Sequence, residues 1–340
     1  MPPYERVDSP DETTIFEYHD LEQPTTADIY RARNVVREHL PRTPLVRSDT
    51  LSEHFSADVY LKREDTLPTG AFKVRGGVHL AATLPEEFHE PGLAAASTGN
   101  HGQSVAYAGR LLDVPVLVGV PEDANPEKVA AMERLGARVE HHGADFDDAR
   151  EYVEQLAVEE GYRYVHSANE PKLIAGVGTA GLEVVEDLPD VEYLFCPVGG
   201  GSSASGYCLT VGELADSKVI GVQSAAAPAA YEAWRDGHLD GHDRMETFAE
   251  GLATRTPFAL SQRVMRERLD DMLLAEDSDL RRWVRRLFAD EHIVAEGASA
   301  AAFAGLEQMA NEVSGSTVVI PISGRNVDPE KLLAIVGDGG

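Results

Sequence analysis

A lysine between two apolar residues is the first feature of this sequence that could carry chemistry. Lys73 lies between Phe72 and Val74 in the run Thr69-Gly70-Ala71-Phe72-Lys73-Val74-Arg75-Gly76-Gly77. Burial disfavours the charged form of an amine, so a neutral, nucleophilic lysine becomes available for Schiff-base chemistry. Taken alone, the same pattern more often marks a surface lysine whose stem lies along apolar residues. Lys73 therefore needs partners before it can be interpreted as a nucleophile.

A short polar run supplies a candidate anion site. Ser97-Thr98-Gly99-Asn100-His101-Gly102 follows an apolar run and precedes a helical pattern. A strand-to-helix turn directs backbone N–H groups and short side chains at one spot, and a helix N-terminus favours a carboxylate there. The alternative is that Ser97 or Thr98 only caps the helix.

A glycine-rich run supplies a candidate phosphate site. Pro197-Val198-Gly199-Gly200-Gly201-Ser202-Ser203-Ala204-Ser205-Gly206 directly follows an apolar run. Consecutive glycines let backbone amides close around phosphate oxygens, and the serines add hydroxyl donors. The run also matches a loose dinucleotide-binding pattern. However, the next apolar run ends in Gln223 rather than in a ribose-binding carboxylate, so the loop favours a monophosphate.

Two further polar residues follow in the C-terminal part of the chain. The apolar run Val318 to Ile322 ends in Ser323 and continues as Gly324-Arg325-Asn326. Ser323 alone is a hydroxyl at a strand end. Glu296 is a helix-start carboxylate unless the fold places it in a cleft.

The other residues that bind metals or form disulfides show no such spacing. Cys196 and Cys208 form no CxxC pair, and the twelve histidines include no HExxH pattern. Neither a disulfide framework nor a zinc site is therefore expected. We expect no bound metal.

The composition restricts partners and surroundings. With 58 acidic and 30 basic residues the formal charge is -28, which disfavours nucleic acids and anionic membranes as partners. The acidic residues are spread along the chain, which predicts a salt-adapted protein; the alternative is an ordinary acidic enzyme. The apolar runs are too short to span a bilayer, and the acidic first 20 residues lack a signal pattern, so we expect the cytoplasm.

The motifs require an α/β scaffold. Apolar runs of β type alternate with helical stretches, which favours parallel sheets. The runs are Val59–Leu61, Leu93–Ala96, Val114–Val120, Tyr193–Val198, Val219–Val222 and Val318–Ile322. A helix is expected over Ile29–Leu40, starting at Thr25-Thr26-Ala27-Asp28. We predict an acidic, flexible arm over 1–24, a small substrate-loop domain over 89–166, and a large cofactor domain built from 25–88 and 167–340.

Together and in this order, the motifs resemble the fold type II pyridoxal-phosphate (PLP) enzymes, specifically the serine/threonine dehydratase (threonine ammonia-lyase) and serine racemase branch. The resemblance covers about Thr25 to Asp328 and includes Arg42-Thr43-Pro44-Leu45 and Pro171 to Thr179. Val74 favours this branch, because sulfhydrylases and threonine synthases of this fold typically have Asp after the lysine. The resemblance implies a two-lobed fold similar to the tryptophan synthase β subunit, and a homodimer.

The same resemblance implies roles for the motif residues. Lys73 would form the Schiff base with PLP, Phe72 would pack near the ring, and Asn100 would bond its phenolic oxygen. Ser323 would face the pyridine nitrogen as a weak acid that leaves the ring a restrained electron sink. The phosphate would be bound by Gly199, Gly200, Gly201, Ser202 and Ser203. The substrate carboxylate would be bound by Ser97, Thr98, Gly99 and His101.

The implied reaction is dehydration and deamination of L-threonine or L-serine to a 2-oxo acid and ammonia. Three departures from the family pattern leave alternatives. Thr98 could donate a proton on the second face, as in a serine or aspartate racemase. Arg325, which replaces a glycine, could bind the second carboxylate of hydroxyaspartate. Gln223 replaces a glutamate metal ligand of some members. An alternative of another class is a non-catalytic PLP or amino-acid binding protein, which has no use for Lys73.

Overall fold

The computed structural model describes residues 21–242 and 245–337, and their contacts divide the chain into two compact units. Unit 1 contains the chain up to Leu40 together with Lys73–Val177. Unit 2 contains Pro41–Phe72 and the chain from Gly178 onward. The division therefore falls between Phe72 and Lys73, in the middle of the first motif.

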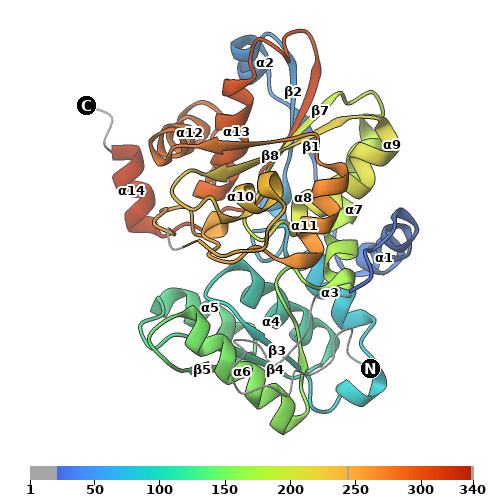
Figure 1. Ribbon diagram of the computed structural model, residues 1–340, viewed down its shortest axis with the longest axis vertical. Helices are drawn as coiled ribbons and strands as arrows, with labels where there is room; N and C mark the ends of the chain where they lie inside the picture. Colours follow the sequence, from blue (N-terminus) through green and yellow to red (C-terminus); the bar gives the residue numbers. More distant parts are fainter. Residues whose placement is uncertain (1–20, 243–244, 338–340) are drawn as a thin grey trace. The chain divides into compact units, whose positions relative to one another are not determined.

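Unit 1 is built on a parallel sheet of four strands in the order β5-β4-β3-β6. Its strands are β3 (Leu93–Ala96), β4 (Val116–Val120), β5 (Arg138–His141) and β6 (Arg163–Tyr164). The helices α4 (Asn100–Leu112) and α6 (Phe146–Glu160) both pack on β3 and β4. Figure 1 shows these two helices on opposite sides of the sheet. The Ser97–Gly102 run thus lies at the carboxyl end of β3, where the chain enters α4.

Three further helices lie in unit 1, and two of them pack on α4. Helix α5 (Pro126–Arg134) packs on it, and so does α3 (Val74–Ala82), which starts one residue after Lys73. Helix α1 (Thr26–His39) packs on α3. It has the expected start, because the Thr25 side chain and the N3 carboxylate of Asp28 each bond the other residue's backbone N–H. This capping box ends the preceding irregular segment.

Small residues allow α3 and α4 to approach closely. A Cβ on Gly77 would lie 2.4 Å from Ser104 Oγ, and one on Gly76 would lie 2.7 Å from a Leu173 side-chain atom. These two glycines of the lysine motif are therefore packing residues rather than ligand-binding residues.

Unit 2 is built on a six-stranded sheet in the order β1-β2-β10-β7-β8-β9. Only the β1–β2 pairing is antiparallel. Its strands are β1 (Leu45–Arg47), β2 (Asp58–Lys62), β7 (Tyr193–Pro197), β8 (Lys218–Ser224), β9 (Asp271–Ala275) and β10 (Thr317–Pro321). The glycine-rich loop follows β7 and Ser323 follows β10, so neighbouring parallel strands bring both motifs to the same sheet edge.

Helices cover both faces of this sheet (Figure 1). On one face lie α12 (Asp277–Asp290) and α13 (Gly297–Gln308). On the other face lie α8 (Ser202–Tyr207) and α11 (Ala259–Arg268). The core between α12, α13 and the sheet includes the stacked rings of Phe55, Trp283 and Phe303. The remaining helices that contribute to unit 2 are α2 (Asp49–Phe55), α7 (Pro171–Asp187, of which residues from 178 belong here), α9 (Glu213–Ala215), α10 (Ala229–Asp236) and α14 (Pro329–Gly337). A π-helix covers Cys208–Gly212, and short 3-10 turns cover Glu64–Thr66, Glu86–Phe88 (in unit 1) and Glu250–Leu252.

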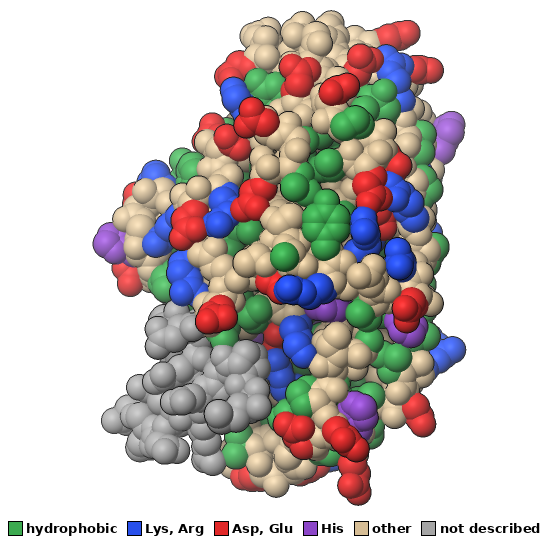
Figure 2. Space-filling view, turned by 90° about the vertical axis from the view of Figure 1, so that its right-hand side faces the viewer, with side chains coloured by type: hydrophobic (Ala, Val, Ile, Leu, Met, Phe, Trp, Pro, Cys, Tyr) green, Lys and Arg blue, Asp and Glu red, His purple; other side chains and the backbone are tan. Residues whose placement is uncertain are grey.

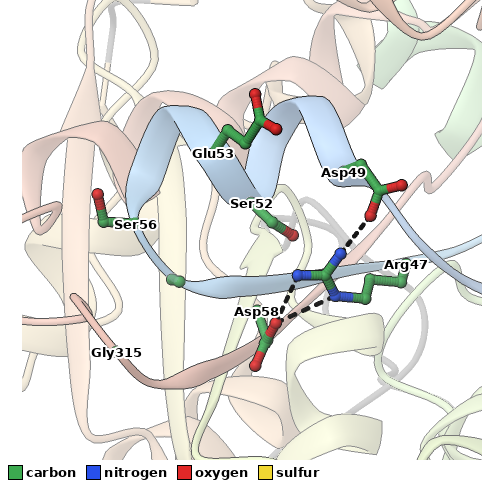
Figure 3. A pocket seen from close by; sticks show the side chains of 8 residues that line it. Arg47, Asp49, Ser52, Glu53, Ser56, Asp58 and Gly315 are labelled. Carbon is green, nitrogen blue, oxygen red and sulfur yellow. Dashed lines mark hydrogen bonds and ion pairs between the residues drawn. The ribbon is translucent and has the colours of Figure 1, made fainter.

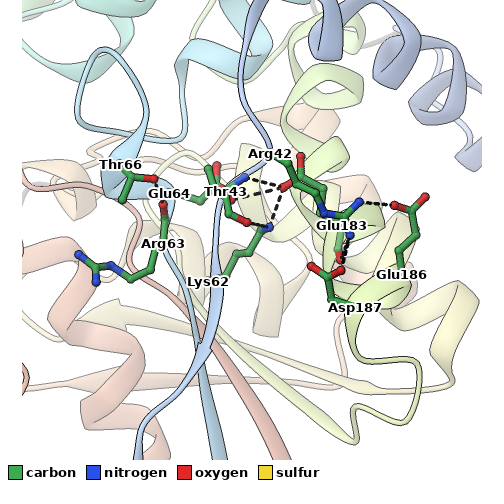
Figure 4. A network of polar contacts seen from close by, with 9 residues as sticks. All are labelled: Arg42, Thr43, Lys62, Arg63, Glu64, Thr66, Glu183, Glu186 and Asp187. Carbon is green, nitrogen blue, oxygen red and sulfur yellow. Dashed lines mark hydrogen bonds and ion pairs between the residues drawn. The ribbon is translucent and has the colours of Figure 1, made fainter.

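A buried polar network ties the β1–β2 hairpin to α7 within unit 2 (Figure 4). Lys62 is fully buried, and its Nζ lies 2.6 Å from Glu183 Oε2 and 2.8 Å from the Thr43 carbonyl. The Thr43 hydroxyl donates to Glu64 at 2.7 Å. Arg42 pairs at the surface with Glu186 and Asp187. Each buried charge in this network therefore has a partner of opposite sign or a hydrogen-bond partner.

The expected fold class is confirmed: two parallel-rich sheets are flanked by helices. All strands of the four-stranded sheet lie inside 89–166, the predicted small domain. However, unit 1 also contains α1 and α3, which lie outside that predicted segment. The predicted domain boundaries stay a prediction. Of the predicted arm, residues 1–20 lie outside the described residues, while Leu21 is buried.

Acidic and basic side chains are interspersed on the face shown in Figure 2. No helix within 21–242 and 245–337 is long and apolar enough to cross a bilayer.

Candidate cofactor and substrate site

Lys73 lies at the N-cap of α3 with its amine in a buried position. Its Nζ donates to the Ser167 carbonyl at 2.8 Å, and burial lowers its pKa to about 8. Its own carbonyl accepts hydrogen bonds from Ser104 Oγ at 2.7 Å and from the N–H of Gly76 at 3.1 Å. The backbone is therefore fixed on α4, while the amine donates to a neutral acceptor and can become neutral near physiological pH.

The run after β3 forms a turn that faces open space within unit 1. Ser97 Oγ accepts from the Gly99 N–H at 3.1 Å. A Cβ on Gly99 would meet no heavy atom within 4 Å. Gly102, in contrast, is tightly packed against Ser97 and Met132. The first turn of α4 thus presents backbone N–H groups beside Thr98 and Asn100, where an anion can bind.

The ring of His101 has a defined protonation state. It is 5% exposed, and burial, assisted by the charge of Lys73, lowers its pKa to about 3. Its Nε2 lies 2.9 Å from the Val165 carbonyl oxygen, which can only accept, so Nε2 carries the proton. Nδ1 is then a bare acceptor and has no hydrogen-bond partner among the described residues. In this geometry the ring donates to Val165 rather than to a carboxylate, so the predicted role of His101 in binding the substrate carboxylate, which stays a prediction, would fall to its backbone N–H.

In unit 2, close contacts hold the glycine-rich loop that leads from β7 into α8. A Cβ on Gly199 would lie 2.1 Å from the Gly251 carbonyl oxygen, and Gly201 has φ +85°. The Gly200 carbonyl accepts from Ser261 Oγ at 2.6 Å. The Ser203 hydroxyl bonds back to the Pro197 carbonyl at 3.3 Å. Glycine is therefore required here by packing and by backbone conformation, and the amides of the loop precede a helix.

Ser323 lies beside the segment of unit 2 that ends at Phe72. The Phe72 N–H donates to the Ser323 carbonyl at 2.9 Å, and Ala71 forms a bridge with Gly324. Further along, the Arg325 N–H donates to the Gly70 carbonyl at 2.9 Å and Asn326 Nδ2 donates to the Thr69 carbonyl at 2.8 Å. Two motifs about 250 residues apart thus form one antiparallel pair of segments in unit 2, and Lys73 is the next residue in the chain.

The Ser323 hydroxyl belongs to a polar cluster at the start of α13. Ser323 is 3% exposed, and its Oγ lies 2.9 Å from Ser299 Oγ and 3.3 Å from Glu296 Oε1. The carboxylate of Glu296 also lies over Gly324, where an added Cβ would be 2.8 Å from Oε1. Glu296 is therefore more than a helix-start carboxylate. Ser299 was not recognisable from sequence, because a serine in an alanine-rich helix has no motif.

Arg325 and Gln223 are placed differently from the other predicted residues. The Arg325 side chain is exposed and runs alongside Gly70. It forms no ion pair within the described part of the chain; the nearby Asp328 instead caps α14 through the N–H groups of Glu330 and Lys331. Gln223 is fully buried and accepts from the Tyr231 N–H at 2.8 Å. Its amide oxygen is thus already used in the fold.

A surface cavity of about 410 Å³ lies elsewhere in unit 2 (Figure 3). It is lined by Arg47, Asp49, Ser52, Glu53, Ser56, Ala57, Asp58 and Gly315. Arg47 pairs with both Asp49 and Asp58, and Glu53 adds a third carboxylate, so the lining carries more negative than positive charge. It contains none of the predicted site residues. Over 21–242 and 245–337, no cluster of three or more His, Cys, Asp or Glu side chains could hold a metal.

Comparison with known proteins assigns a class to this arrangement. Residues 36–324 match the family described as pyridoxal-phosphate dependent enzyme, and the chain belongs to this family. The residues present fit the cofactor: a lysine with lowered pKa, a glycine turn with no room for side chains, and a buried serine at a neighbouring strand end. The match also removes the dinucleotide-binding interpretation of the glycine-rich loop.

Individual relatives narrow the class. The chain is 35% identical to L-threonine ammonia-lyase from Thermotoga maritima over 316 residues, which cover 93% of this chain and 79% of the relative. It is 32% identical to L-threo-3-hydroxyaspartate ammonia-lyase from Saccharomyces cerevisiae, covering 92% of this chain and 96% of the relative. Threonine deaminase isoform 2 from Solanum lycopersicum superimposes with a TM-score of 0.87, at 26% identity, and the match covers 100% of this chain and 98% of that chain.

Proposed function

We propose that this PLP-dependent enzyme is an ammonia-lyase that converts L-threonine or L-serine to a 2-oxo acid and ammonia. The observation that carries the proposal is the amine of Lys73, whose burial lowers the pKa to about 8 on a backbone fixed by α4. The similarity to L-threonine ammonia-lyase over 93% of the chain supports the same reaction. A non-catalytic binding protein has no need of such an amine.

When bound, PLP supplies an aldehyde for a covalent link and a ring that withdraws electrons from the substrate α carbon. Gly199 to Ser203 would hold its phosphate, Asn100 its phenolic oxygen and Ser323 its ring nitrogen, with Phe72 near the ring. The Lys73 amine would provide the covalent link and, once released, would hold the proton taken from the substrate α carbon. The β-hydroxyl would leave with a proton as water, and the unsaturated amine product would hydrolyse to the 2-oxo acid and ammonia.

The substrate carboxylate would be bound by the turn at the start of α4. Ser97, Thr98 and Gly99 contribute short polar groups, and Asn100 and His101 contribute N–H groups of the first helical turn. The neutral His101 ring adds no positive charge to this site. The Thr98 hydroxyl is also the candidate donor for a racemase activity, which Thr98→Ala would remove without affecting elimination.

A second candidate function is dehydration of 3-hydroxyaspartate. It is favoured by the exposed guanidinium of Arg325, which has no ion-pair partner in the described residues of this acidic chain, and by the similarity to the yeast hydroxyaspartate ammonia-lyase. A cation at this position could bind a substrate's second carboxylate.

Reduction and turnover test the main proposal. The purified holoenzyme should absorb in the Schiff-base region, borohydride should abolish that band and fix the cofactor to Lys73, and Lys73→Ala should lose both the band and turnover. Lys218→Ala, which changes an exposed lysine of unit 2, is the control. A panel of L-Thr, L-Ser, D-Ser and hydroxyaspartate isomers, scored for oxo acid and enantiomer, identifies the substrate. Normal turnover by Lys73→Ala would refute the proposal.

Three broader expectations accompany this function. Family resemblance supports a homodimer. Two buried free cysteines, Cys196 and Cys208, suit a reducing compartment such as the cytoplasm. The formal charge of -28 supports adaptation to concentrated salt. The large cofactor domain and small substrate-loop domain keep the boundaries predicted from sequence.

A further inference from the structure

We infer that His166 is a positioning residue for the amine of Lys73. Its ring holds the peptide between Ser167 and Ala168 so that the carbonyl of this peptide faces Lys73 Nζ. The amine is then kept in one place whenever it is not joined to the cofactor. This inference deepens the proposed function, because it rests on the reaction of Lys73 with PLP.

His166 lies in the short segment of unit 1 that leads from β6 to α7. Strand β6 pairs in parallel with β3, so this segment starts at the same sheet edge as the turn that follows β3. Two carbonyls of the segment contact predicted site residues. The Val165 carbonyl lies 2.9 Å from His101 Nε2, and the Ser167 carbonyl accepts from Lys73 Nζ at 2.8 Å. His166 is the residue between these two carbonyls.

The buried ring of His166 accepts two backbone hydrogen bonds. Its Nδ1 lies 3.1 Å from the Ala168 nitrogen and 2.9 Å from the Asn169 nitrogen. A backbone N–H can only donate, so Nδ1 carries no proton. Burial lowers the pKa of His166 well below its usual range, which keeps the ring neutral. The ring therefore acts as a fixed acceptor for the two peptides that follow it.

One of these N–H groups belongs to the same peptide as the carbonyl that faces Lys73. The peptide between Ser167 and Ala168 is trans, so its C=O and N–H groups point in opposite directions. The bond from the Ala168 N–H to His166 therefore directs the Ser167 carbonyl away from the ring and toward Nζ. Hydrogen bonds in such a chain strengthen one another. The Lys73 amine thus lies at the end of a chain that starts at the His166 ring.

The orientation of the amine matters for its chemistry. A carbonyl oxygen takes one hydrogen of a neutral amine and leaves the nitrogen lone pair unused. This lone pair attacks the PLP aldehyde and later takes the substrate proton. Lysine has a long, flexible stem, so an amine without this carbonyl would sample other positions. Misplacing a reacting group by about 1 Å can cost about a hundredfold in rate.

Two substitutions separate the acceptor of His166 from the rest of its ring. His166→Asn retains an acceptor, because a short side-chain oxygen can also bond the N–H groups two and three residues further along. His166→Ala removes the acceptor. His79→Ala is the matched control, because His79 is also 7% exposed in unit 1 and bonds a different carbonyl, that of Lys172, at 2.7 Å.

The test mixes full-length apoenzyme with PLP and follows Schiff-base absorbance by stopped flow from pH 7 to pH 10. Well above the Lys73 pKa of about 8 the amine is neutral, so the plateau rate reports its orientation rather than its protonation. We expect this plateau to fall about tenfold in His166→Ala and to stay within about twofold of the wild type in His166→Asn and His79→Ala. In His166→Ala, kcat on L-threonine should fall more than KM changes.

The outcomes separate this inference from the proposed function. An unchanged plateau in His166→Ala, or a loss of the same size in His166→Asn or His79→Ala, overturns the inference. The wild type provides a test that needs no variant: 15N NMR of labelled histidine should find the His166 proton on Nε2, and a proton on Nδ1 overturns the inference even if His166→Ala fails to fold. Absence of a Schiff-base band in the wild type instead refutes the proposed function.

Discussion

At the scale of single residues, the environment of Lys73 determines when its amine can react. Burial is the cause of its lowered pKa of about 8, and its Nζ donates to the neutral Ser167 carbonyl. A lysine with an ordinary pKa near 10.4 would be almost fully protonated at neutral pH. The hydrophobic flanks of Lys73 predicted this shift, but the acceptor could not be predicted, because Ser167 is 94 residues away in sequence.

This pKa predicts the pH dependence of cofactor incorporation. Only the neutral amine attacks the PLP aldehyde. Because the pKa of Lys73 is lowered, the neutral amine is present at a lower pH than in an ordinary lysine. The rate at which apoenzyme forms the Schiff base should therefore rise about tenfold from pH 7 to well above pH 8 and then level off. Stopped-flow absorbance measures this rate. A rate that keeps rising up to pH 10 would show an unperturbed lysine.

Arg325 can discriminate between the two candidate substrates. A charge-assisted contact with a second carboxylate contributes about 1.5–3 kcal/mol, or roughly one to two decades in kcat/KM. Arg325→Gly should therefore lower the efficiency on L-threo-3-hydroxyaspartate by that factor while sparing L-threonine. Arg255→Gly, a change of the same kind at another position, is the control. If kcat/KM on hydroxyaspartate relative to kcat/KM on threonine is the same in the wild type and in Arg325→Gly, the dicarboxylate function is eliminated.

At the scale of elements, the glycine-rich loop depends on close backbone packing. Gly199 faces the Gly251 carbonyl, and an alanine Cβ would lie 2.1 Å from its oxygen. The oxygen belongs to the backbone, and the backbone fixes the position of the Cβ, so Gly199→Ala must move the loop. We therefore expect PLP affinity to fall about tenfold or more, which corresponds to about 1.4 kcal/mol. Fluorescence titration of the apoenzyme measures this. Gly337→Ala, where a Cβ meets open space, should bind PLP normally.

The buried pair between β2 and α7 should contribute strongly to stability. Lys62→Met removes the buried cation that pairs with Glu183, and breaking such a buried pair costs about 3–5 kcal/mol. Lys331→Met breaks the exposed pair with Glu250, and such pairs contribute about 0–1 kcal/mol. Denaturant unfolding should separate the two variants clearly. Similar losses in both would mean that the buried network is not required for stability.

Local sequence pattern predicted the elements next to the motifs better than those at the sheet margin. Leu93–Ala96 was predicted with its observed bounds, and Thr25 caps α1 as expected. The strands β1 and β9 were not predicted, because both are edge strands whose pairing is set by β2 and β8. The Ser299–Ser323–Glu296 cluster was also beyond prediction, since it depends on the close packing of Gly324 against α13.

At the scale of the whole molecule, the net charge of -28 is the dominant property. Many carboxylates have arginine partners at the surface, such as Asp58 with Arg47 and Glu213 with Arg268. The excess remains because the chain has 58 acidic residues for 30 basic ones. Like charges repel in the compact state, so the folded molecule is destabilised wherever this repulsion is not screened.

Salt should therefore stabilise the protein. The Debye length falls from about 8 Å at 0.15 M to about 3 Å at 1 M, which screens most repulsion between surface carboxylates. We expect Tm to rise by roughly 5 °C between 0.1 M and 2 M KCl, about 1–2 kcal/mol for a chain of this size. Replacing the exposed residues Glu122, Glu127 and Glu133 by glutamine removes three negative charges and should reduce this gain. Sucrose at matched osmolarity controls for solvent exclusion, which acts without screening. Maximal stability at low ionic strength, or an equal gain in sucrose, would show that the acidic surface is not an adaptation to salt.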